Sequence, residues 1–128
     1  MKLKHIFYYA IIPVSLCQLS GTKEYDYQKL GYTQNGKASY YGTEFHGKPT
    51  ASGEKYNMYD GTAAHKRILF NSLVEVVNRE NGKTSIVRIN DRGPFKKNRE
   101  LDLSKEAFMQ ITDNKNHGTL QVTIEIIK

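Results

Sequence analysis

Apolar and polar residues alternate in several short segments between residue 36 and the end of the chain. In residues 120–126 every second residue is apolar, which predicts a strand with one buried face. Asn81 and Gly82 separate two β-branched runs, and both residues tolerate positive φ, so they predict a hairpin turn. The predicted strands are residues 37–41, 61–65, 73–77, 84–90 and 120–126.

One further segment has the features of a short helix. Ser104 is a favourable N-cap, and Glu106 follows in the first turn, where the helix dipole favours an acid. Residues 107–111 are then largely apolar, whereas residues 45–57 are rich in Gly, Pro, Ser and Thr and predict a long loop. Several short strands with a single helix indicate a small closed β-barrel.

The amino terminus has the pattern of an export signal. Two lysines precede an apolar run over residues 6–16, which is too short to span a bilayer but has the length of a signal-peptide core. Residues 14–17, Val-Ser-Leu-Cys, resemble a bacterial lipobox, although a leucine replaces the small residue that usually precedes the cysteine. We therefore expect residues 1–16 to be a lipoprotein-type signal peptide and Cys17 to be lipidated. Ordinary signal cleavage nearby is the alternative.

This anchor sets the expected location of the protein. Residues 18–35 are polar with no apolar period, so we expect a flexible tether between Cys17 and a domain formed by residues 36–128. Lipidation holds a protein at a membrane surface without spanning the bilayer. We expect a lipid-anchored protein of the cell envelope, on the outer membrane facing the periplasm if the bacterium is Gram-negative.

Charge and composition narrow the class of partner and cofactor. The 128 residues carry 19 Lys and Arg against 13 Asp and Glu, a net charge of +6. The basic residues are scattered rather than gathered on one stripe, so we expect no nucleic-acid partner; weak attraction to an anionic polymer such as the bacterial wall fits the charge. The four histidines show no paired spacing, so we expect no metal and no other cofactor. We expect a monomer.

Three segments carry polar residues that a core does not need: residues 47–54, 62–66 and 90–95. Asp91 comes directly after a predicted strand, where a rigid scaffold presents side chains to solvent. Each candidate residue also has a structural alternative. Asp91 could cap its own turn, and Arg92 could be its ion-pair partner. Glu54 could be a solvated surface acid, and His65 could be a structural histidine.

Six short motifs follow one another along the chain. They are GKASYYG (residues 36–42), FHGK (45–48), TASGE (50–54), AAH (63–65), RINDRGPF (88–95) and LDLS (101–104). Together they resemble the rare lipoprotein A family of bacterial lytic transglycosylases. The resemblance covers residues 36–127 and implies a mainly β fold, a small six-stranded double-psi β-barrel with one or two short helices. The family usually has Leu-Pro-Phe-Gly-Thr where this chain has residues 68–72, but Asn71 can adopt the left-handed conformation that Gly supplies.

The resemblance also implies an activity. A lytic transglycosylase cleaves the β-1,4 bond between N-acetylmuramic acid and N-acetylglucosamine in peptidoglycan glycan strands without water, and leaves 1,6-anhydro-muramoyl ends. The resemblance implies that Asp91, Glu54 and His65 are the catalytic residues of this chain. We expect Asp91 to be the acid and base, held part-protonated in a half-buried groove. Glu54 would support the developing positive charge or share the proton, and His65 would orient one of the two carboxyl groups by a hydrogen bond.

Four more residues are expected to bind substrate: Tyr40, Tyr41, Asn90 and Arg92. The two tyrosines are candidate sugar platforms, although strand aromatics are equally expected in a core. Two other functions stay open beside the enzyme. One is an expansin-like protein that loosens glycan strands without cutting them, and the other is a structural lipoprotein that tethers the wall.

Overall fold

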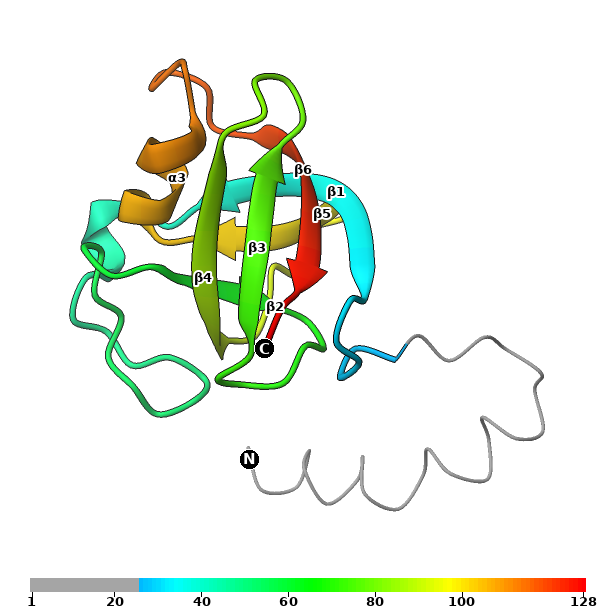
Figure 1. Cartoon of the computed structure of the whole chain (residues 1–128). Helices are drawn as coiled ribbons and strands as arrows, with labels where there is room; N and C mark the ends of the chain where they lie inside the picture. The colour runs from blue at the N-terminus through cyan, green and yellow to red at the C-terminus, as the bar shows by residue number, and fades with distance from the viewer. Residues whose placement is uncertain (1–25) are drawn as a thin grey trace.

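The structure is a computed structural model that describes residues 26–128 (Figure 1). The predicted signal peptide, Cys17 and the first part of the predicted tether lie outside the described residues. Within residues 26–128, no helix has the length and apolar character needed to cross a bilayer. The elements are β1 (Thr33–Tyr40), the 3-10 helix η1 (Thr43–Phe45), β2 (Thr62–His65), β3 (Leu73–Asn78), β4 (Thr84–Asp91), β5 (Arg99–Leu103), α3 (Lys105–Ile111) and β6 (Leu120–Ile126).

Six strands close into a barrel in the order β1-β5-β2-β4-β3-β6. The pairs β1–β5 and β2–β4 are parallel, and the other four pairs are antiparallel. In Figure 1, β3, β4 and β6 stand side by side at the front, while β1, β5 and β2 cross behind them. The predicted mainly β fold, a six-stranded double-psi barrel with a short helix, is confirmed.

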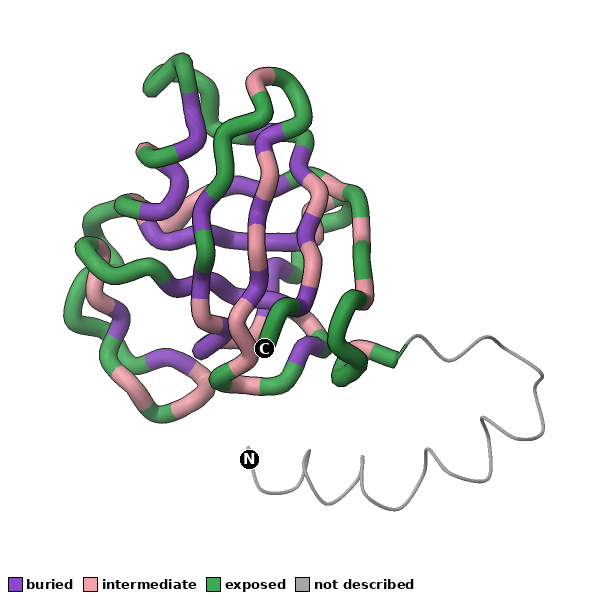
Figure 2. Tube along the Cα trace, in the orientation of Figure 1, coloured by how far each residue is buried: buried purple, intermediate pink, exposed green. Residues whose placement is uncertain are grey.

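The alternating pattern of the strands fills the barrel with apolar side chains. In β6, every second residue is buried, from Leu120 to Ile126, as the sequence pattern predicts. Figure 2 shows the same alternation of buried and more exposed positions along β3 and β4. Phe108 of α3 is fully buried and joins the same core. The helix begins as predicted, because the Ser104 side chain accepts a hydrogen bond from the Ala107 backbone N–H at 3.2 Å.

The start of the domain differs from the prediction. β1 begins at Thr33, so residues 33–35 belong to the barrel and not to the predicted tether. The backbone N–H of Gly31 donates to the carbonyl of Ile126 at 2.8 Å, and Tyr27 and Tyr32 pack against the core. Residues 27–32 show no apolar period in the sequence. In the structure the rings of Tyr27 and Tyr32 pack against the core, and the carbonyl of Tyr32 accepts a hydrogen bond from the backbone N–H of Ile126. The prediction of a flexible tether is therefore wrong for residues 33–35.

One strand has no counterpart among the predicted strands. In β5, Leu101 and Leu103 are fully buried and alternate with Glu100 and Asp102, but two apolar positions are too short an alternation to predict a strand from the sequence. The strand exists because β1 and β2 pair with it on both sides. At the β2–β3 connection, Asn71 has a φ of 70°, which confirms that it takes the left-handed conformation in place of glycine.

Candidate active site

Asp91 is the last residue of β4 and lies where the pairing with β2 shifts register. Ala63 pairs with Ile89, but Ala64 pairs with Asp91, so Asn90 is the extra residue of a bulge. Such a bulge re-aims the side chains at the end of a strand. Asp91 is half-buried, whereas Asn90 is buried.

The Asp91 carboxylate accepts hydrogen bonds from three donors. Its Oδ2 accepts from the Tyr41 hydroxyl at 2.8 Å. Its Oδ1 accepts from the backbone N–H of Ala51 at 2.8 Å and from that of Arg92 at 2.9 Å. Only one of the three donors belongs to the turn that follows Asp91, so turn capping does not account for this arrangement. Segments far apart in the sequence hold the carboxylate in one orientation.

Tyr41 reaches the site, and Tyr40 does not. The Tyr41 ring packs against Tyr56, with ring centroids 4.9 Å apart, and its hydroxyl donates a hydrogen bond to Asp91. Burial and the hydrogen bond to Asp91 raise the pKa of Tyr41 far above its usual value, so the hydroxyl stays a donor at neutral pH. The Tyr40 ring is partly buried and packs against the core, 4.5 Å from the Phe108 ring. This contact favours the core alternative that the sequence left open, and a sugar platform at Tyr40 stays a prediction.

Glu54 is bound to strand β4 through Arg88. The Arg88 guanidinium donates to both carboxylate oxygens of Glu54, at 2.6 and 2.8 Å. Asn90 Nδ2 donates to the same carboxylate at 3.3 Å. The hydrogen bonds from Arg88, more than those from Asn90, hold the pKa of Glu54 below its usual value. Glu54 is thus kept ionised, and the side-chain amide of the buried Asn90 is bonded to it.

The loop that carries Glu54 lies against the end of β4. The backbone N–H of Ser52 donates to the carbonyl of Asn90 at 3.3 Å, one residue before Asp91. Thr50 closes the loop on itself, because its backbone N–H donates to the carbonyl of Glu54 at 2.7 Å. The structure therefore brings Glu54 and Asp91 to the same end of β4. The Glu54 carboxylate bonds to Arg88 and Asn90 there and not to Asp91. The prediction that Glu54 shares a proton with Asp91 is therefore not supported by a direct contact.

His65 is 2% exposed and has a structural role. Its Nδ1 accepts hydrogen bonds from the backbone N–H groups of Arg67 and Ile68, both at 3.0 Å. Since Nδ1 accepts, Nε2 carries the proton and donates to Oε1 of Gln34 at 3.0 Å. Burial lowers the pKa of His65 to about 4, so the ring is neutral at pH 7. The predicted hydrogen bond from His65 to Asp91 or Glu54 is wrong, because other partners occupy both nitrogens.

Arg92 connects the Asp91 segment to the loop after β2. Its Nη1 donates to the carbonyls of His65 and Ile68 at 3.2 and 2.9 Å. Its guanidinium lies 4.0 Å from the centre of the Phe70 ring, which is a cation–π contact. The side chain does not pair with the Asp91 carboxylate, which bonds the Arg92 backbone instead. Arg92 therefore stabilises the site, and its predicted role as a substrate ligand is not favoured.

Asp102 lies beside this site, although sequence reasoning gave it no role. It is 8% exposed, accepts a hydrogen bond from the Ser39 hydroxyl and pairs with Arg99 at 3.1 Å. Asp102 pairs with Ala64 of β2, the residue that pairs with Asp91 on its other side, and its negative charge adds to the rise in the pKa of Tyr41. The signal in the sequence was an acid between two apolar residues in the LDLS motif.

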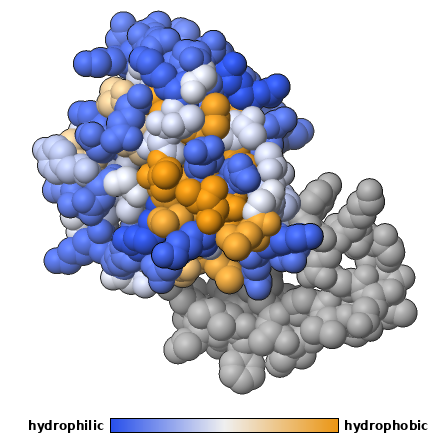
Figure 3. Space-filling view, in the orientation of Figure 1, coloured by the Kyte–Doolittle hydropathy of each residue, from blue (hydrophilic) through white to orange (hydrophobic). Residues whose placement is uncertain are grey.

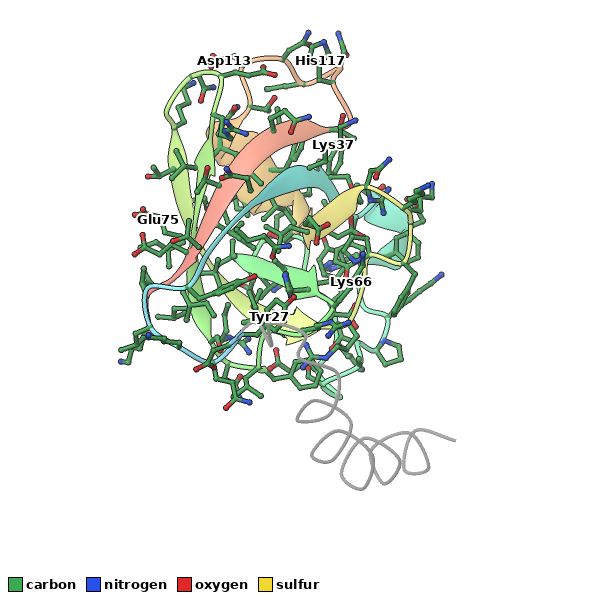
Figure 4. The ribbon with its side chains drawn as sticks, turned by 90° about the vertical axis from the view of Figure 1, so that its right-hand side faces the viewer. Tyr27, Lys37, Lys66, Glu75, Asp113 and His117 are labelled. Atoms are coloured by element: carbon green, nitrogen blue, oxygen red, sulfur yellow. The ribbon has the colours of Figure 1, made fainter. Side chains whose placement is uncertain are left out.

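The opposite end of the barrel carries other polar groups. Figure 4 shows Asp113 and His117 at one end and Tyr27 at the other. The Tyr27 ring lies 5.8 Å from the His65 ring, so Tyr27 marks the end that carries the site. Among residues 26–128, no three His, Cys, Asp or Glu side chains are grouped as metal ligands.

The chain is similar to a known family and to known proteins. Residues 33–124 match the family described as lytic transglycolase, with a double-psi β-barrel. The chain belongs to this family. It is 50% identical over 97 residues to the endolytic peptidoglycan transglycosylase RlpA of Vibrio cholerae, and 51% identical over 100 residues to that of Neisseria meningitidis serogroup A. The alignments cover 76% and 78% of this chain, but only 36% and 41% of those relatives. The chain thus spans well under half of their length.

Solved structures support the fold of this family member. The Streptomyces papain inhibitor superposes with a TM-score of 0.65 at 22% identity, over 79% of this chain and 99% of the inhibitor. An expansin of Clavibacter michiganensis superposes with a TM-score of 0.59 at 20% identity, over 75% of this chain and 50% of the expansin. At such low identity, these likenesses concern the barrel alone.

Proposed function

We propose that this domain is a lytic transglycosylase that cleaves peptidoglycan glycan strands, with Asp91 as its acid and base. One observation carries the proposal: the Asp91 carboxylate is held by three donors from three segments, at the end of β4. Family membership supports the same activity, since the relatives are named endolytic peptidoglycan transglycosylases. The cleaved bond is proposed to be the β-1,4 bond between N-acetylmuramic acid and N-acetylglucosamine.

The reaction needs one proton to move between two oxygens. The C6 hydroxyl oxygen of the muramoyl sugar forms a bond to its own C1, while the bond from C1 to the glycosidic oxygen breaks. The C6 hydroxyl loses a proton and the leaving oxygen gains one, so no water is consumed. A single carboxyl group can serve both oxygens in turn, as base and as acid.

We propose that one oxygen of Asp91, Oδ2, carries out this transfer. A carboxylate offers about four acceptor sites, two on each oxygen. Ala51 and Arg92 occupy Oδ1, whereas Tyr41 occupies one site on Oδ2. Oδ2 therefore keeps a free position for the substrate proton. The ionised Glu54, part of the same end of β4, would stabilise positive charge that develops at C1.

The test uses the full chain with purified peptidoglycan and with glycan strands stripped of stem peptides. The wild-type protein should release 1,6-anhydro-muramoyl products, detected by mass spectrometry, and Asp91→Asn should release none. Asp113→Asn is the control, because Asp113 is an exposed carboxylate at the opposite end of the barrel (Figure 4). A wild-type protein that co-sediments with the wall but releases no anhydro product would instead be an expansin-like binder. If Asp91→Asn cuts as well as wild type, the acid is another residue.

We further propose that Cys17 is lipidated and anchors the protein in the cell envelope. The lone cysteine after an apolar run supports this proposal. Labelled palmitate should be incorporated into the wild-type protein and not into Cys17→Ala. Equal labelling of the two proteins would rule out Cys17 as the lipidated residue.

A further inference from the structure

Phe95 is an exposed aromatic ring four residues after Asp91. It is 84% exposed, the largest fraction among the exposed large apolar residues of the described chain. Within residues 26–128, its ring makes no contact with another aromatic ring or with a cation. Single exposed apolar residues are common on protein surfaces. Exposure alone therefore does not assign a role to Phe95, whereas its position beside the Asp91 segment does.

The backbone between Asp91 and Phe95 is packed against the barrel. Gly93 and Pro94 are both buried, so the backbone that presents Phe95 is packed against the barrel. A β-carbon at position 93 would lie 3.6 Å from Cε2 of Phe95, which means that the ring lies across Gly93. Gly93 is two residues after Asp91, and Arg92 between them is bonded to the loop after β2. The backbone that carries the ring is thus anchored four residues after Asp91.

Other aromatic residues near Asp91 do not offer a similar free ring. Tyr41 packs against Tyr56 and Phe45, with its hydroxyl bonded to Asp91. Phe45 has the Lys48 ammonium 5.4 Å from its ring centre in addition to Tyr41. Phe95 is therefore the aromatic side chain beside the site that keeps a ring face available to a ligand.

We propose that Phe95 is a sugar-binding platform on which a pyranose ring of the glycan strand stacks, next to the bond that Asp91 acts on. This inference rests on the proposed function for the identity of the ligand. The face of an aromatic ring is the negative side of its quadrupole, and the C–H bonds on one face of a pyranose ring are slightly positive. Contact between the two faces orients the sugar without a charged group. Binding energy from such a neighbouring contact positions the scissile bond at the carboxylate.

Binding is measured with the full chain carrying Asp91→Asn, so that the strands are not cut during the measurement. The probe is soluble glycan strands prepared from peptidoglycan by removing the stem peptides. In this background, Phe95→Ala should weaken binding about tenfold, and Phe95→Trp should restore it to within about threefold. Ile86→Ala is the matched control, because Ile86 is 55% exposed and lies about 16 Å along β4 from Asp91. This control should bind like its parent.

Three results would overturn the platform. They are unchanged binding by Phe95→Ala, an equal loss in Phe95→Ala and Ile86→Ala, and a loss that Phe95→Trp does not reverse. Thermal unfolding of Phe95→Ala should match that of its parent, since the ring buries little surface. The proposed function fails separately: if the wild-type chain releases no anhydro product while binding still depends on the ring at position 95, the enzyme is excluded and the sugar platform stands.

Discussion

The Tyr41 hydroxyl donates a 2.8 Å hydrogen bond to Oδ2 of Asp91 across 50 positions of sequence. This bond joins the end of β1 to the end of β4, two strands that are not neighbours in the barrel. It fixes the orientation of the carboxylate and leaves one acceptor site of Oδ2 for a substrate. The relationship makes Tyr41 a positioning residue for Asp91.

Tyr41→Phe should therefore slow the formation of anhydro products about tenfold or more. A hydrogen bond to a charged group contributes about 1.5–3 kcal/mol, and the variant loses this bond while its ring still packs against Tyr56. The rate is measured by mass spectrometry of released products at saturating glycan. Tyr59→Phe, which changes an exposed tyrosine, is the control and should keep the wild-type rate. A wild-type rate in Tyr41→Phe would contradict the positioning role.

Glu54 is expected to act as an ionised group. Arg88→Met should raise the pKa of Glu54 toward its usual value, since the hydrogen bonds from Arg88 are the largest cause of its lowering. Because the folded-state pKa of Glu54 is lowered, the ion pair contributes stability above the unfolded pKa and loses it as the pH falls through the folded value. Carboxylate titration by NMR measures the pKa directly.

Activity gives a second measurement on the same carboxylate. Glu54→Gln should lower the rate of anhydro-product formation, because the negative charge that supports C1 is lost. Glu75→Gln alters an acid on the side of the barrel (Figure 4) and should not change the rate. Equal rates in wild type and Glu54→Gln would show that Glu54 only holds its loop in place.

His65 should make the fold sensitive to mild acid. Its pKa is about 4 in the folded protein and about 6.5 in an unfolded chain, so the unfolded state binds more protons between these values. The contribution of His65 to the free energy of unfolding is fully present above pH 6.5, and it falls by about 3 kcal/mol as the pH decreases to 4. Urea unfolding at several pH values measures this slope. The slope should be smaller in His65→Asn, which keeps an acceptor near the position of Nδ1.

Arg92 should be more sensitive to substitution than other surface arginines. Lysine lacks the planar group that stacks on Phe70 while donating to two carbonyls, so Arg92→Lys should destabilise the fold by about 1–3 kcal/mol. Arg79→Lys, at an exposed position, should change stability by less than about 0.5 kcal/mol. Chemical denaturation compares the two. Equal stabilities would mean that the contacts of Arg92 contribute nothing to the fold.

The outer surface of the barrel also has an apolar region. Figure 3 shows apolar residues gathered over the face formed by β3, β4 and β6, where Ile86 and Ile127 are exposed. On β4, outward-facing Ile86 and inward-facing Val87 have similar side chains but opposite exposure. The apolar pattern along a strand therefore identifies the strand, and the closure of the barrel decides which face is covered.

The sequence by itself determined the local features. The alternation in residues 120–126 and the cap at Ser104 depend on residues within a few positions of one another, so both could be predicted. The ordered motifs also indicated the family and placed Glu54 and Asp91 in it. β5 was missed because its alternation has only two apolar positions, and pairing with β1 and β2 makes it a strand.

Only the tertiary structure decided what each candidate side chain does. His65 bonds Gln34 across 31 positions, and Glu54 bonds Arg88 across 34. The physical reason is that barrel closure brings strand ends together, and hydrogen-bond distance depends on that closure rather than on sequence spacing. Asp91 was a possible turn cap from its own neighbours; the hydroxyl of Tyr41 and the N–H of Ala51 make it an oriented carboxylate.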